Sequence, residues 1–278
     1  MNPNQLFDAE MAKRHPIQIL LVDDNAINLK VASRMLLRMG YEVDQATNGL
    51  EAVEAQRSTG YDLIFMDIQM PEMDGVTATK HIINEYSDDE RPRIVAVTAH
   101  AMKGDRERYL DAGMDGYISK PVRVERLIEE IKETPCKVAV GVLDGGMQSS
   151  PAMSINHAPA RVSEPSPVDL GIFAEMLGMD MEDAEEMLPE LIELFIDDSA
   201  EQIVHMRNAI NTFNFDLLRN ASHKMKGGAA SVAAIPLSKH CGKLEKMALD
   251  QEILGSKGVL EAAENEFERI KKWFAEHG

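Results

Sequence analysis

The chain has 278 residues, 44% of them hydrophobic and 27% charged, which is typical of a soluble globular protein and, by length, of two domains. Its formal net charge of -18 disfavours binding to the phosphate backbone of nucleic acids. The two cysteines, Cys136 and Cys241, lie far apart and outside any paired motif, so we expect reduced thiols in a cytoplasmic protein rather than a disulfide framework or a zinc site.

The first half begins with a leader, 1–16, followed by apolar runs that alternate with amphipathic stretches over 17–133. Short apolar segments predict strands at 17–22, 41–46, 61–67, 93–99 and within 116–121. Helical spacing predicts helices at 26–39, 50–58, 76–86, 105–113 and 124–133. This alternation predicts an α/β domain, a doubly wound five-stranded parallel sheet with helices on both faces.

The second half has a different pattern. Residues 134–167 are rich in Pro, Gly, Ser and Ala, so we interpret them as a flexible linker, with docking of 138–143 as an additional strand the less favoured alternative. From 168 to 278 apolar residues recur at helical spacing. We expect a short helix at 169–177 and four main helices at 181–210, 215–234, 236–249 and 259–277. Their short connections predict an antiparallel four-helix bundle.

Polar side chains gather where the predicted parallel strands end. In chain order these residues are Asp23, Asp24, Asp67, Thr98 and Lys120. Because the carboxyl ends of parallel strands share one edge, three carboxylates should converge there with a hydroxyl and an ammonium. A single acidic residue at a strand end is ordinarily a solvated charge or a helix cap, but that explanation accounts poorly for a set distributed over four strands.

These groups have a shared chemistry. Converging carboxylates repel one another and favour a bound cation, and oxygen ligands of this kind suit Mg²⁺. A carboxylate can also attack phosphorus and form an aspartyl phosphate. Mg²⁺ and Lys120 would then neutralise charge on the phosphoryl oxygens, and Thr98 would hydrogen-bond one of them. The pattern predicts a magnesium-dependent phosphoryl acceptor.

Four motifs extend this reading: VDDN at 22–25, MDIQMPEMDG at 66–75, VTA at 97–99 and SKP at 119–121. Through them the first half resembles response-regulator receiver domains, with no departure at a key position. The resemblance implies the flavodoxin-like fold of that family and a cis peptide bond before Pro121.

The resemblance also implies roles for single residues. Asp67 would be the phosphorylated aspartate, Asp24 would bind Mg²⁺ directly, and Asp23 would bind it mainly through water. The backbone carbonyl of Gln69 would be a third protein ligand. Thr98 and Lys120 would be the phosphate-sensing pair of the family, and Tyr117 would be its aromatic switch.

The second half contains ASHKMKGGAA, in which two glycines follow His223 within about one turn. Glycine in a helix interior costs about 1 kcal/mol relative to alanine. At about 100° per residue, His223 lies opposite the apolar stripe of its helix, so we expect it to face outward beside Arg219, Lys226 and Gly227. An unremarkable surface histidine is the less favoured alternative.

The expected neighbours of His223 suit phosphoryl transfer. Gly227 would leave room for a bulky partner, and Lys226 would place a positive charge where a phosphoryl group on the imidazole would lie. Gly228 falls nearer the bundle and would allow close helix packing. Histidines near the edges of apolar stripes, His205 and His240, are better interpreted as boundary residues.

The motif SHKMKGGA at 222–229 resembles the signature of histidine phosphotransfer domains, with Met225 in place of the commoner leucine. The later CGKLEKMA at 241–248 is similar to the next helix of that family. This resemblance covers roughly residues 168–278. It implies that His223 accepts a phosphoryl group and that Arg219, Lys226 and Gly227 belong to the docking face.

Together the two halves predict a two-component phosphorelay protein with reversible transfer between Asp67 and His223, within the chain or with partner proteins. The expected partners are an upstream histidine kinase and other receiver or phosphotransfer proteins. A flexible linker of this length would span about 30 Å, which permits both routes. The peptide FDAEMAKRHP resembles the connector that precedes receivers in hybrid sensor histidine kinases, so a C-terminal fragment of such a kinase is an alternative.

Several patterns are missing from the sequence. No glycine-rich nucleotide-binding motif occurs, so we expect a signalling carrier without its own ATP-binding kinase domain. No apolar run is long enough to cross a membrane, and no signal peptide is evident. A magnesium-dependent phosphohydrolase is an alternative, but such enzymes commonly carry aspartate where Gln69 stands. A phosphorylation-free scaffold is disfavoured by the intact pocket, and the oligomeric state stays open.

Overall fold

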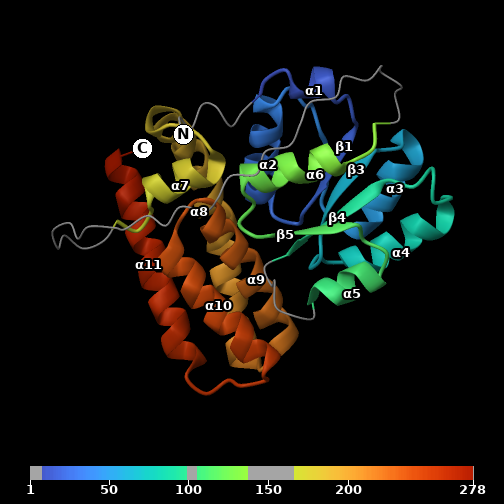
Figure 1. The fold of residues 1–278 in the computed structure, drawn as a ribbon. Helices are drawn as coiled ribbons and strands as arrows, with labels where there is room; N and C mark the ends of the chain where they lie inside the picture. The colour runs from blue at the N-terminus through green and yellow to red at the C-terminus, as the bar shows by residue number, and fades with distance from the viewer. Residues whose placement is uncertain (1–7, 99–104, 137–165, 278) are drawn as a thin grey trace.

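The computed structural model describes residues 8–98, 105–136 and 166–277 (Figure 1). Most of the predicted linker, including the candidate strand at 138–143, therefore lies outside the described residues. No helix in the described ranges combines the length and apolarity that a membrane span requires.

Five parallel strands form one sheet in the order β2-β1-β3-β4-β5. Their bounds are β1 Ile19–Val22, β2 Asp44–Ala46, β3 Leu63–Asp67, β4 Arg93–Thr98 and β5 Gly116–Ser119. Successive residues of a strand point to opposite faces, so Leu21 and Phe65 enter one apolar core while Leu20 and Ile64 enter the other. Burial on both faces explains why these strands are continuous apolar runs. The predicted doubly wound fold is confirmed.

Helices cover both faces of this sheet. One face carries α2 (Ala26–Arg38) and α6 (Val124–Glu133). The other face carries α3 (Gly49–Thr59), α4 (Gly75–Glu85) and α5 (Asp105–Asp111). The side chains of Asn25, Asn48 and Asp74 accept hydrogen bonds from backbone N–H groups in the first turns of α2, α3 and α4. Such caps begin each helix directly after a strand-end loop, which fixes the loops that form the site.

The described part of the leader packs on the first domain. It forms α1 (Met11–Arg14), a short helix whose Met11 is buried. The Tyr41 hydroxyl donates to the carbonyl of His15 at 2.8 Å, and Nε2 of His15 donates to the carbonyl of Thr134 at 2.9 Å. The second bond ties the leader to the end of α6 and so brings the entry and the exit of the domain together.

The second half is a helical bundle, as predicted. A short helix, α7 (Leu170–Leu177), precedes α8 (Met181–Thr212), α9 (Phe215–Ser231), α10 (Ile235–Leu249) and α11 (Ser256–His277). Each of the four long helices packs against the next, and α11 closes the bundle against α8. In the core, the rings of Phe195 and Phe267 meet edge to face with centroids 6.2 Å apart.

The two halves pack against each other through α2, which lies against α8 and α9 (Figure 1). A continuous apolar core runs from the sheet through α2 into the bundle. Ion pairs surround this contact: Lys30 and Arg34 with Glu190, and Arg38 with Asp183 at 3.1 Å. These side chains are partly exposed, so apolar packing contributes most of the contact energy and the ion pairs contribute little.

Candidate functional site

The acidic residues predicted at the strand ends do converge. Asp23, Asp24 and Asp67 each place a carboxylate oxygen within 4.8 Å of the others. The ammonium of Lys120 lies 2.7 Å from carboxylate oxygens of both Asp23 and Asp67. The bond between Lys120 and Pro121 is cis, as the family resemblance implied. One ammonium therefore faces three carboxylates.

The pKa values in this cluster reflect its burial and its excess of negative charge. Burial raises the pKa of Asp67 to about 7, against the lowering effect of Lys120. Burial and the neighbouring Asp23 raise the pKa of Asp24 to about 6. Burial alone would lower the pKa of Lys120, but Asp23 and Asp67 outweigh it and raise that pKa. The cluster is short of positive charge, and its oxygen ligands are those that Mg²⁺ prefers, so these residues fit a bound Mg²⁺.

The other predicted receiver residues surround this cluster. The hydroxyl of Thr98 is buried and lies 3.1 Å from the hydroxyl of Tyr109. The backbone N–H of Gln69 donates to Asp67 at 3.3 Å. Tyr117 lies half buried on β5, packed against the core that α3, α4 and α5 cover. Phosphate sensing by Thr98, Mg²⁺ binding by the carbonyl of Gln69 and switching by Tyr117 stay predictions.

His223 on α9 is held by a carboxylate from the next helix. Its Nδ1 lies 2.6 Å from Oε1 of Glu245, and Nζ of Lys226 lies 2.5 Å from Oε2 of the same carboxylate. An ionised carboxylate only accepts hydrogen bonds, so Nδ1 carries the proton and Nε2 keeps a free lone pair. Burial would raise the pKa of Glu245, but His223 and Lys226 lower it to about 2, which keeps it ionised.

Two expectations about this helix are wrong. His223 was expected to be exposed, yet only 7% of it is accessible. Glu245 of the next helix contacts its Nδ1, and the ring lines a cavity shared with the receiver. Lys226 was expected to place its charge beside the phosphoryl position, whereas its ammonium pairs with Glu245. A helical wheel of α9 alone shows neither Glu245 nor the receiver.

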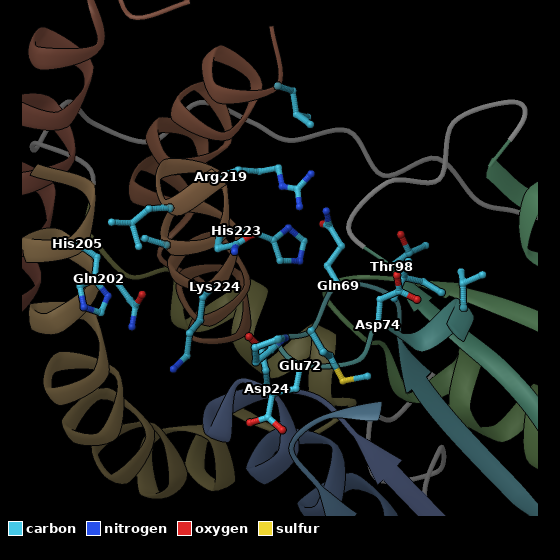
Figure 2. A pocket seen from close by; sticks show the side chains of 18 of the residues that line it. Asp24, Gln69, Glu72, Asp74, Thr98, Gln202, His205, Arg219, His223 and Lys224 are labelled. Atoms are coloured by element: carbon cyan, nitrogen blue, oxygen red, sulfur yellow. The ribbon is translucent and has the colours of Figure 1, made fainter. Parts of the chain in front are cut away.

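A cavity of about 680 Å³ separates the two domains at this point (Figure 2). Residues from both domains form its walls, among them Asp24, Gln69 and Thr98 from the receiver side and Arg219, His223 and Lys224 from α9. Asp67 lies beneath this wall, 1% accessible and bonded to Lys120. The structure thus brings the histidine of one domain and the acidic pocket of the other to the same space.

Hydrogen bonds beside the cavity join α9 to the beginning of α2 in the receiver. Nδ2 of Asn25 donates to the carbonyl of Lys224 at 3.0 Å. The Ser231 hydroxyl donates to Oδ1 of Asn28 at 2.7 Å, and Nδ2 of Asn28 donates to Asp23 at 2.9 Å. A short chain of hydrogen bonds therefore connects the bundle to a carboxylate of the acidic cluster.

The two glycines after His223 permit this close approach. A Cβ on Gly227 would lie 3.3 Å from Nδ2 of Asn28. A Cβ on Gly228 would lie 3.0 Å from Ile27 and 3.3 Å from Phe195. Gly228 therefore faces the receiver as well as the bundle core. The partner for which the glycines leave room is α2 of the same chain.

Glu245 is a residue of this candidate site that the sequence motifs did not reveal. It is 1% accessible although it carries a charge. A signal was present, because Glu245 follows Cys241 by four residues and so falls on the apolar stripe of α10. A carboxylate on such a stripe must find a partner in the interior, and here it finds two.

Comparison with known proteins agrees with this architecture. Residues 19–132 match the model of the response regulator receiver domain, and residues 190–273 match the Hpt domain. The polar-differentiation response regulator DivK of Brucella anthropi is 44% identical over 120 residues, which are 42% of this chain and 94% of that protein. The chain belongs to the response regulator receiver family. With an Hpt domain after its receiver, it is a two-component phosphorelay protein.

Solved structures also resemble the receiver. The complex of the Saccharomyces cerevisiae histidine phosphotransfer protein Ypd1 with the Ssk1 receiver domain includes a chain 32% identical, with a TM-score of 0.40, covering 43% of this chain and 89% of that chain. A second structure is the receiver domain of the sensor histidine kinase PA1611 from Pseudomonas aeruginosa, with a magnesium ion in its active-site cleft. It is 38% identical, with a TM-score of 0.39, and the match covers 42% of this chain and 96% of that chain.

Proposed function

We propose that Asp67 and His223 exchange a phosphoryl group within one chain, with Mg²⁺ at the acidic cluster. The observation that carries this proposal is the cavity whose walls hold both His223 and the receiver pocket residues Asp24, Gln69 and Thr98. Docking through α2 holds donor and acceptor domains together, which replaces a bimolecular encounter by an intramolecular one.

On the receiver side, Asp67 is the nucleophile. One of its carboxylate oxygens forms a bond to the phosphorus of the donor while the bond from phosphorus to the leaving group breaks. Lys120, already bonded to Asp67, stabilises charge on the phosphoryl oxygens. When bound, Mg²⁺ would be held by Asp23, Asp24, Asp67 and the carbonyl of Gln69, and it would neutralise further charge on those oxygens.

On the bundle side, His223 needs no base. Its Nε2 lone pair attacks phosphorus while the bond to the Asp67 oxygen breaks and the electron pair stays on the carboxylate. The Nδ1 proton remains in place, so the phosphorylated ring becomes cationic. Glu245 then stabilises that cation through the bond it already makes to Nδ1. The reverse transfer follows the same steps.

The phosphoryl group enters or leaves through partners. An upstream histidine kinase, other receivers and other phosphotransfer proteins are the proposed partners, and a cytoplasmic location stays a prediction. The proposed domain limits are 17–133 for the receiver and 168–278 for the phosphotransfer bundle, joined by 134–167.

The test is labelling with a small acyl phosphate and Mg²⁺, resolved on a phosphate-affinity gel. The intact chain, Asp67→Asn and His223→Gln are compared, and the linkages are distinguished by their acid and base lability. Phosphohistidine in the intact chain that is absent from both variants is expected. A mixture of the two variants should form phosphohistidine far more slowly than the intact chain. Label that stays on Asp67 of the intact chain would refute internal transfer.

A further inference from the structure

The cations around the cavity differ in whether they already have a partner. Lys120 bonds to Asp23 and Asp67, and Lys226 bonds to Glu245. Lys224 pairs with Asp198 at 2.7 Å. Arg219 has no ion-pair partner within the described residues, and its Nε is buried without a hydrogen-bond partner. On the bundle side of the cavity, it is the cation whose donors are still available.

Arg219 is also placed next to the reacting histidine. It precedes His223 by four residues on α9, so the two side chains emerge from the same face of the helix, one turn apart. Both line the cavity. Figure 2 shows them reaching from α9 toward the receiver, with the side chain of Gln69 extending toward them from the opposite wall.

When a phosphoryl group moves from Asp67 to His223, it leaves behind the positively charged groups that surround it on the receiver. At Asp67 it lies beside Lys120 and the acidic cluster that fits Mg²⁺. At His223 the nearby Lys226 is already neutralised by Glu245. A guanidinium is planar and presents several N–H donors that match phosphate oxygens in pairs. Arg219 can supply the positive charge that the bundle side otherwise lacks.

We infer that Arg219 is a phosphoryl-binding residue: it donates hydrogen bonds to the phosphoryl oxygens during transfer and while the group rests on His223. This inference rests on the proposed transfer to His223. Arg219 stays protonated throughout and forms no covalent bond. It stabilises the dispersed charge of the transition state and then the dianionic group of the phosphohistidine.

The first experiment measures transfer in the full chain after Asp67 has been loaded with a small acyl phosphate. Arg219→Gln should slow phosphohistidine formation by about 10- to 100-fold, the range for a charge-assisted hydrogen bond, while loading of Asp67 is unchanged. The matched control is Arg207→Gln, an arginine on α8 that pairs with Glu264 and does not line the cavity. Ethylguanidinium should partly restore transfer in Arg219→Ala, because a small cation can enter the vacated space.

The inference would be overturned if phosphohistidine formed at equal rates in Arg219→Gln, in Arg207→Gln and in the wild-type chain. Slow transfer in Arg219→Ala that the small cation does not relieve would also overturn it, because that result indicates a packing role.

A second measurement does not depend on transfer from Asp67. In an Asp67→Asn chain, His223 is phosphorylated directly with phosphoramidate, and the phosphorus resonance is titrated by NMR. With Arg219 present, the pKa of the phosphoryl group should lie about one unit lower than in the Arg219→Gln variant. Identical pKa values would refute the inference. If the unchanged chain loads Asp67 and never forms phosphohistidine, the proposed transfer fails, and this titration still decides the role of Arg219.

Discussion

The receiver side and the bundle side of the cavity differ in their balance of charge. On the receiver side, three carboxylates share one ammonium, and the pKa values of Asp67 and Asp24 rise to about 7 and about 6. On the bundle side, one carboxylate, Glu245, serves both an imidazole and an ammonium, and its pKa falls to about 2. The receiver wall requires an added cation, whereas on the bundle wall Glu245 is already paired and Arg219 is left without an ion-pair partner among the described residues.

This difference fits the proposed division of the chemistry between Asp67 and His223. A site that lacks positive charge gains most when a cation and a phosphoryl group bind together, so the receiver wall suits activation of phosphorus. On the bundle wall, the paired carboxylate of Glu245 holds the ring of His223 with a fixed proton and a free lone pair, so this wall suits presentation of a nucleophile. Four experiments can break or sharpen this comparison.

Removal of Mg²⁺ should have the largest effect, and on one wall only. Chelation with EDTA should lower small-donor labelling of Asp67 by about 100-fold or more, because the carboxylates lose the cation that offsets their repulsion. Direct phosphorylation of His223 by phosphoramidate in the Asp67→Asn chain, where no label can arrive from Asp67, should be unchanged, and it serves as the control. Equal losses at both residues would show that the bundle wall also depends on the metal. Gel quantification of both linkages gives the answer.

Replacement of Glu245 by Gln should slow transfer to His223 by about 10- to 100-fold. Glutamine can still accept the Nδ1 hydrogen bond, but it cannot balance the cationic ring that forms on phosphorylation. Single-turnover transfer from loaded Asp67 measures this. Lys226→Met is the control, because it leaves the bond between His223 and Glu245 intact and should slow transfer less. Native speed in Glu245→Gln would mean that the charge of Glu245 is not needed.

Gly227→Ala should separate bundle stability from docking. Alanine is the better helix former by about 1 kcal/mol, so the thermal midpoint of the bundle should rise. Its Cβ would lie 3.3 Å from Nδ2 of Asn28, so this side chain, which bonds to Asp23 and Ser231, must shift by a few tenths of an ångström, and internal transfer should slow by roughly fivefold. Gly258→Ala is the control, because a Cβ there has open space around it. Transfer at the native rate in Gly227→Ala would show that this approach is not limiting.

The pH dependence of His223 should be the most subtle difference. Burial lowers its pKa below the usual 6.5, although Glu245 acts in the opposite direction. Transfer should therefore persist as the pH falls through 6.5, because the ring is still neutral. The stability that the neutral ring contributes is present above pH 6.5 and is lost as the pH falls from there toward the lower folded pKa. An NMR titration midpoint of His223 at or above 6.5 would contradict this.

The amino-acid sequence alone determined the helices and strands and the acidic cluster on the receiver side of the cavity. Apolar runs buried on both faces predicted the strands, and strand ends of a parallel sheet must share an edge, so the convergence of Asp23, Asp24, Asp67 and Lys120 followed from topology. Helical spacing predicted the bundle in the same way. These patterns are local in the chain or follow from one general rule, which is why they could be predicted.

Only the tertiary structure showed how the residues around His223 are arranged on the bundle side of the cavity. Glu245 links to His223 and Lys226 from the next helix, and Gly227 and Gly228 approach α2, which lies in the other domain. These contacts, and the burial of His223, all depend on how separate helices pack. A helical periodicity reports which way a side chain leaves its own helix, and it contains no information about what covers that side chain. The shared cavity exists because α2 docks on α8 and α9, and that contact depends on the complementary shape of two folded surfaces.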